Sequence, residues 1–125
     1  MSFDIFLQGF ENGGRAPGMP EKANQVLQPY LQVSPEGFTR VITDDGDAEV
    51  YGVGTDGLTF THASGRQVWK VMYEVARAGN WAIIPVGCPP CVPTPTMVAH
   101  LPDELRADAL VVSSGDEVLA AVLRS

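Results

Sequence analysis

The stretch 37-GFTRVITDDGDAEVYGVGTDGLTFTHASGRQVWKVMYEVARAGN-80 decides the fold of this chain. It holds three runs that are rich in β-branched and aromatic residues, at 37–44, 48–54 and 57–63. The segments "DDGD" and "GTDG" separate these runs, and Asp and Gly favour the tight turns that hairpins need. The pattern therefore predicts a meander of three antiparallel strands.

The second half of the same stretch predicts the main helix. Ser64 and Gln67 have the spacing of a capping box, in which each side chain satisfies a free backbone donor. Gly79 lies where a helix of this length is expected to stop. The apolar stripe that should face the sheet consists of Val68, Trp69, Val71, Met72, Val75 and Ala76. We expect a helix over Ser64–Gly79 that packs on the sheet, and core positions for both Trp69 and Trp81.

The flanking segments add strands and shorter helices. Alternation over Ser2–Phe10 predicts an interior strand, and the apolar run 81–87 predicts a central one. The segment 11–20 is expected to be a loop because it holds two adjacent glycines and two prolines. The remaining expected elements are a helix from Glu21 that Pro29 kinks or ends, one or two helical turns started by Pro102, a strand at 109–113, and a final helix capped by Ser114 and Glu117.

Together these elements predict a single α+β domain over residues 1–125. We expect a mainly antiparallel sheet of about five or six strands, with two to three helices packed on it. A chain of 125 residues with 45% hydrophobic residues is long enough and apolar enough to bury one core. No internal repeat or linker divides the chain.

The charge of the chain narrows the classes of partner. Fifteen acidic residues against eight basic ones give a net charge of −7, which repels nucleic acid and anionic lipid and favours a cationic protein. The opening "MSFDIFLQGF" has Asp4 where a signal peptide needs basic and then purely apolar residues. No apolar run is long enough to span a membrane. We therefore expect a cytoplasmic protein that binds neither nucleic acid nor membrane.

The loop 85-PVGCPPCVPTP-95 carries the most reactive residues. Cys88 and Cys91 have the spacing that dithiol oxidoreductases and zinc knuckles share. Pro93 and Pro95 argue against a helix beginning at Cys88, so strong activation of its thiolate is not expected. The pair has three interpretations: a redox dithiol, part of a zinc site, or two small hydrophobic residues held in a stiff loop.

A zinc site would use Cys88, Cys91 and His100 as its first three ligands. The fourth would be His62, a carboxylate such as Asp103, or a ligand from a second protomer. Zinc is the one cofactor that the residues suggest.

Four acidic residues cluster in the first turn of the meander: Asp44, Asp45, Asp47 and Glu49. Their order lacks the alternating ligands and distal glutamate of an EF-hand loop. A hairpin turn with solvated charge explains the cluster better than a calcium site does. The cluster is also a candidate landing patch for a basic partner.

No complete catalytic set is present in the sequence. His62 and Ser64 lie close together, but no "GxSxG" elbow or nearby acid completes a hydrolase triad. The glycine-rich segments lack the spacing and the lysine of a phosphate-binding loop.

Five segments resemble, in the same order, a family of small bacterial proteins of uncharacterised function. They are "MSFDIFLQGF" (1–10), "DAEVYGVG" (47–54), "THASGRQVW" (61–69), "PVGCPPCV" (85–92) and "HLPDEL" (100–105). The resemblance implies no substrate, cofactor or catalytic residue. The chain is also similar in size, charge and its "SFDIF" opening to immunity proteins of bacterial toxin systems, which neutralise a toxin by binding it.

We expect a non-enzymatic binding protein, of an immunity or regulatory type, that recognises a basic protein partner. The alternative is a thiol-redox or zinc-binding protein that uses Cys88 and Cys91. A hydrolase or transferase with an unfamiliar site is a third class, which would need a pocket of convergent polar groups. A homodimer joined along an edge strand is compatible with the expected sheet.

Overall fold

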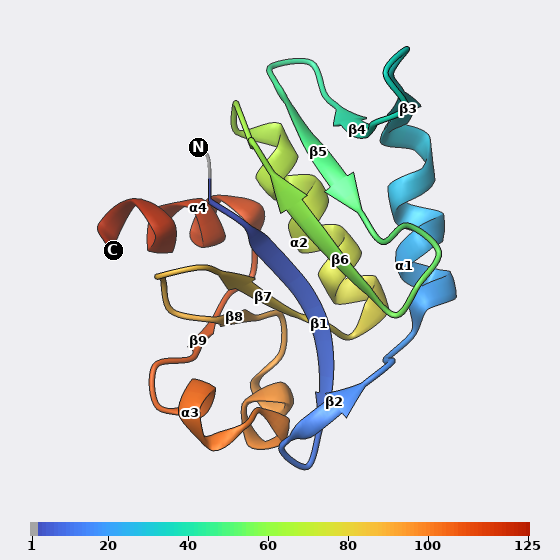
Figure 1. Cartoon of the computed structure of the whole chain (residues 1–125). Coiled ribbons are helices and arrows are strands. Elements are labelled where there is room, and N and C mark those ends of the chain that lie inside the picture. The colour runs from blue at the N-terminus through green and yellow to red at the C-terminus, as the bar shows by residue number, and fades with distance from the viewer. Residues whose placement is uncertain (1–2) are drawn as a thin grey trace.

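Within residues 3–125, nine strands form one sheet that is antiparallel except at its last pair. In the computed structural model, which describes residues 3–125, their order is β3-β4-β5-β6-β1-β7-β8-β9, with β2 paired to β1 (Figure 1). β8 and β9 run parallel. The strands are β1 Ile5–Glu11, β2 Gly14–Ala16, β3 Leu31–Val33, β4 Thr39–Ile42, β5 Asp47–Tyr51, β6 Gly57–Thr61, β7 Ala82–Pro85, β8 Cys91–Val92 and β9 Leu110–Val111.

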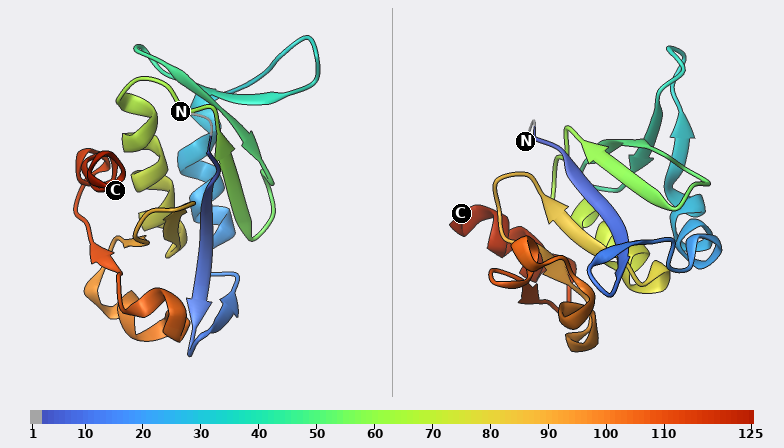
Figure 2. Two further views of the ribbon diagram at one scale, coloured as in Figure 1. Left: turned by 60° about the vertical axis from the view of Figure 1, so that its left-hand side comes forward. Right: turned by 60° about the horizontal axis from the view of Figure 1, so that its bottom comes forward.

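Three of the helices, α1, α2 and α4, cover one face of this sheet (Figure 2). The α-helices are α1 Pro20–Leu27, α2 Gln67–Gly79, α3 Asp103–Arg106 and α4 Gly115–Arg124, and the 3-10 helices are η1 Gln28–Tyr30 and η2 Pro95–His100. α2 lies between α1 and α4 and contacts both. Among the residues described, no helix combines the length and apolarity needed to cross a bilayer.

The main core lies between the sheet and these three helices. Leu7, Phe60 and Ile83 point into it from β1, β6 and β7, and Trp69 reaches it from α2. Both tryptophans are buried as expected, and the Trp81 indole N–H donates to the carbonyl of Pro17 at 2.8 Å. The large side chains of this core are therefore buried without an unsatisfied polar group at Trp81.

Among the residues that the structure describes, a second cluster of apolar side chains covers the opposite face of the sheet at its β7–β8 end. Met97 and Leu101 from the η2 segment pack there against Ala82 and Val92, and form a second, smaller core. Side chains on the central strands of this face remain solvent-accessible. We call this surface the open face. Phe6, Thr59 and Tyr51 lie on it in register, and Gln8 follows Phe6 on the same side of β1.

The strand count differs from the expected five or six. The six expected strands appear as β1, β4, β5, β6, β7 and β9 in the predicted order, although Ser2 lies outside the described residues. Three further strands, β2, β3 and β8, have only two or three residues each. Their pairing is set by the strands beside them, and so short a run carries no readable alternation.

The start of α2 also differs from the prediction. The helix begins at Gln67, and no side chain of the adjacent residues caps it. Instead, the Asp45 carboxylate in the β4–β5 turn accepts the N–H groups of Arg66 at 2.9 Å and Gln67 at 3.2 Å. The capping box at Ser64 was therefore wrong. The Asp45 carboxylate, from a turn distant in sequence, caps the helix instead. A free backbone N–H at a helix start can be satisfied by any acceptor oxygen within hydrogen-bond distance.

The other helix ends agree more closely with the sequence. α1 begins at Pro20 and gives way to a 3-10 turn at Pro29. Ser114 accepts the N–H of Glu117 at 3.2 Å, so it caps α4 as predicted. α2 runs to Gly79, but its left-handed C-cap is the next residue, Asn80, with φ 56°.

Candidate functional site

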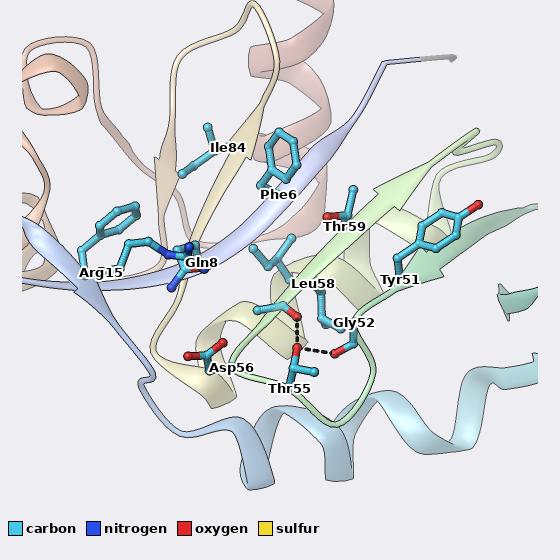
Figure 3. Close-up of a pocket in the computed structure, with 13 residues that line it drawn as sticks. Phe6, Gln8, Arg15, Tyr51, Gly52, Thr55, Asp56, Leu58, Thr59 and Ile84 are labelled. Atoms are coloured by element: carbon cyan, nitrogen blue, oxygen red, sulfur yellow. Dashed lines mark hydrogen bonds between the residues drawn. The ribbon is translucent and has the colours of Figure 1, made fainter.

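A hollow of about 580 Å³ lies on the open face, above β1 and β6. Phe6 and Ile84 form its apolar side, Tyr51 stands at its far edge, and Arg15 and Asp56 supply charge (Figure 3). Phe6 and Tyr51 are 39% and 46% exposed, although both are aromatic residues on interior strands of the sheet. We call this region the hollow.

The β5–β6 turn forms one wall of the hollow. Its shape is held by Thr55, whose hydroxyl oxygen lies 2.7 Å from the Gly52 carbonyl oxygen and 2.9 Å from that of Gly57 (Figure 3). The Thr55 N–H also donates to the Gly52 carbonyl, at 3.0 Å. The turn therefore presents Asp56 from a backbone that is fixed by several hydrogen bonds.

Gln8 and Arg15 form the opposite wall. The Arg15 guanidinium donates to the Gln8 side-chain oxygen at 2.7 Å, and the Gln8 amide donates to backbone carbonyls of Gly9 and Ala16. Gly57 faces Gln8 across the β1–β6 pair, and a Cβ there would lie 3.0 Å from the Gln8 oxygen. A side chain at Gly57 would thus press against the Gln8 amide.

Tyr51 experiences a negative local field. Its hydroxyl donates to the Glu49 carboxylate at 3.2 Å. Desolvation is the largest cause that raises the Tyr51 pKa above 10.0, followed by the hydrogen bond and charge of Glu49 and then the charge of Asp4. Two carboxylates therefore lie near the aromatic edge of the hollow, in addition to Asp56.

The four acidic residues chosen from the sequence have different surroundings. Asp45 caps α2, and Asp47 forms an ion pair with Arg40 and accepts the hydroxyl of Ser64 at 3.0 Å. Asp44 is exposed in the turn, and Glu49 bonds to Tyr51. Asp45 and Asp47 thus have internal partners that stabilise the turn.

Cys88 and Cys91 lie apart from His100. Cys91 is on β8 in the main core, and Cys88 is half-buried in the loop before it. The His100 ring accepts the N–H of Asn12 at 3.2 Å, beside the β1–β2 turn, and His62 is exposed after β6. Within residues 3–125, no group of three or more His, Cys, Asp or Glu side chains could hold a metal ion. The expected zinc ligand set is therefore not assembled.

The aromatic residues of the hollow were missed as candidate site residues. The alternation over Ser2–Phe10 places Phe6 on the face opposite Leu7, and the β5 pattern places Tyr51 opposite Val50. An aromatic residue on the less apolar face of a strand was the available signal. It was insufficient alone, because the sequence does not reveal which face the helices cover.

Comparison with known proteins identified no relative of this chain. No family model matches the chain, and neither a curated protein nor a solved structure matches it.

Proposed function

We propose that this chain is a non-enzymatic binding protein, of a regulatory or immunity type, whose open face receives a basic protein partner. The observation that carries this proposal is the hollow itself, in which exposed aromatic side chains lie beside carboxylates on an uncovered sheet. The resemblance of the sequence to small bacterial proteins and to immunity proteins is compatible with such a role.

The apolar part of the hollow favours a macromolecular contact. Phe6 and Tyr51 flank Thr59 across three neighbouring strands, and Ile84 extends the row on the other side of Phe6. Aromatic residues dominate the energetics of protein interfaces, because they bury a large area at a small cost in side-chain entropy. A partner that covers this row removes apolar surface from water that the fold itself leaves exposed.

The charged part of the hollow favours a basic partner. Glu49, Asp4 and Asp56 lie around the aromatic row, while Asp47 already neutralises Arg40. Arg15 is the cationic residue that lines the hollow, and its guanidinium is engaged by Gln8. With a net charge of −7, the chain attracts a cationic surface at long range, and the rim carboxylates orient it at short range.

Site-directed photo-crosslinking tests which surface the partner uses. Tyr51 is replaced by p-benzoylphenylalanine, which keeps an aromatic ring at this position, and the variant is expressed in cells that make the protein naturally. The matched control carries the same amino acid at Leu123, which is 67% exposed on α4. We expect an adduct with a basic protein from position 51 and none from position 123.

The partner identified by crosslinking is then purified, and its dissociation constant is measured with the wild type and with variants of this chain. Phe6→Ser should raise the Kd about 30-fold or more. This corresponds to a loss of about 2 kcal/mol in binding free energy, as expected for a hot-spot residue. Leu123→Ser should leave the Kd unchanged, and Glu49→Gln should slow association and reduce its salt dependence.

Four results would overturn the proposal: no adduct from position 51, an adduct with an acidic partner, equal weakening by Leu123→Ser, or an adduct that joins two copies of this chain. The last result would identify the open face as a homodimer interface.

A further inference from the structure

The two cysteines lie in unequal surroundings at the β7–β8 connection. Cys91 is fully buried, and its thiol lies 3.8 Å from the carbonyl oxygen of Pro89. Cys88 is half-buried and packs at the margin of the same core. One thiol is thus accessible to reagents while its neighbour is protected from them.

Cys88 also lines a groove of about 590 Å³ between its loop and the helices α3 and α4. Glu104 and Asp108 contribute carboxylates to this groove, and Arg124 contributes a guanidinium. The groove lies on a different part of the molecule from the hollow, and the two share no lining residue. A reagent can therefore reach Cys88 without crossing the open face.

We propose that Cys88 and Cys91 form a peroxide-sensitive dithiol, in which Cys88 is oxidised first and Cys91 then closes an intramolecular disulfide. In the first step the Cys88 thiolate attacks one oxygen of a peroxide. The O–O bond breaks, hydroxide leaves, and Cys88 becomes a sulfenic acid. In the second step the Cys91 sulfur attacks the Cys88 sulfur. The S–O bond breaks, the Cys91 proton leaves with the hydroxyl as water, and the S–S bond forms.

The two thiols are assigned these roles by their burial. Burial is the largest cause that raises the Cys91 pKa, to about 11, with a further rise from Cys88 and a smaller opposing effect of Arg124. Cys91 is consequently a protonated thiol at neutral pH, which makes it a poor first target for a peroxide. Its later attack on the oxidised Cys88 is intramolecular and releases the Cys91 proton in the same step. The accessible Cys88 is left as the first site of attack.

The charges of the groove select the oxidant. Two carboxylates against one guanidinium disfavour an anionic reagent such as oxidised glutathione. A peroxide is neutral and small enough to enter beside the two prolines of the loop. Gly87, which precedes Cys88, has φ 81° and no neighbouring atom within 4 Å of a Cβ position. The backbone before Cys88 is therefore not packed against the rest of the chain at Gly87.

Hydrogen peroxide and the full-length chain test this proposal. The wild type should lose two free thiols and the mass of two hydrogen atoms, while remaining monomeric on a non-reducing gel. In Cys91→Ser the reaction should stop at a sulfenic acid on Cys88 that dimedone traps. In Cys88→Ser the remaining thiol should react at least about tenfold more slowly, because it is buried and protonated.

Parallel reactions separate the proposal from general thiol oxidation. Oxidised glutathione at the same concentration should react more slowly than hydrogen peroxide with the wild type. Circular dichroism of both serine variants checks that they are folded, and alanine variants replace any that are not. Equal rates for the two single variants, intermolecular dimers in the wild type, or faster reaction with oxidised glutathione would overturn the proposal. None of these outcomes depends on whether the open face binds a partner.

Discussion

The two faces of β1 show how one strand serves two purposes. Leu7 points toward the helices and is 1% exposed, whereas its neighbour Phe6 points to the open face and is 39% exposed. Both are large apolar residues, yet only the first is enclosed by the fold. The difference indicates that the helix-covered face holds the stability of the molecule, and that the apolar surface of the open face is available for contact.

The strongest test of this contrast is Leu7→Ala. Removing a fully buried leucine leaves a cavity between the sheet and α2, so the free energy of unfolding should fall by about 2–5 kcal/mol. Urea denaturation followed by circular dichroism measures it. A loss below about 1 kcal/mol would indicate a loosely packed covered face, and the contrast with Phe6 would then fail.

Gly115→Val tests how tightly the helix layer is packed. A Cβ at Gly115 would lie 2.4 Å from the Cα of Lys70, so α4 would have to move away from α2. Such overpacking should cost about 1–3 kcal/mol in thermal or urea unfolding. Gly14→Ala is the matched control, because its nearest neighbour would lie at 3.8 Å. An equal loss in the control would argue against this close helix contact.

Asp45→Ala tests the link between the meander and the covering helix. Removing the acceptor leaves the N–H groups of Arg66 and Gln67 without their partner, so the urea midpoint should fall, by less than in Gly115→Val. Asp45→Asn should lose less, because an amide oxygen can also cap.

The same cap predicts a dependence on pH. The N–H of Arg66 is the largest cause that lowers the Asp45 pKa below 3.8 in the folded state. The ionised Asp45 carboxylate therefore stabilises the folded state fully at pH values above the unfolded pKa of 3.8. This stabilisation is lost as the pH falls through the lower pKa that Asp45 has in the folded state. Unfolding measured from pH 6 to pH 2 should show a smaller acid-induced loss in Asp45→Asn than in the wild type. Parallel curves for the two proteins would contradict the cap.

Phe6→Ser should have the smallest effect on the fold. The side chain is partly exposed and no described helix covers it, so the free energy of unfolding should fall by about 1 kcal/mol, which is less than in Leu7→Ala. Unfolding under the conditions used for Leu7→Ala provides the comparison. A loss as large as that of Leu7→Ala would mean that the two faces of β1 contribute equally to stability.

Long segments with clear alternation were predictable from the sequence. β1, the meander and β7 each have at least four residues whose apolar pattern identifies a strand, and Pro20 and Pro29 mark the limits of α1. β2, β3 and β8 were not predictable, because each is short and has glycine or proline within it or close beside it, which indicates a loop. β9 is equally short, but it lies within the longer β-prone run 109–113.

The acidic character of the candidate site was predictable from the sequence, but the positions and partners of its residues were not. Acidic charge was recognised in the β4–β5 turn, but Asp45 and Asp47 bind other parts of the chain, separated from them by up to 22 residues. Such partners are set by tertiary packing and leave no local signal. The same limit applies to Phe6 and Tyr51, which become a shared surface only after β1 is inserted beside β6.

The central position of β1 has a consequence for synthesis of the chain. β1 is synthesised before its partners β6 and β7, which end only at residues 61 and 85. At about 5–20 residues per second, this strand waits several seconds with apolar side chains on both sides, while the three-residue β2 is its only partner strand already synthesised among residues 3–125. Chaperones that bind exposed apolar segments of nascent chains would therefore be expected to act on β1 until β6 and β7 have been made.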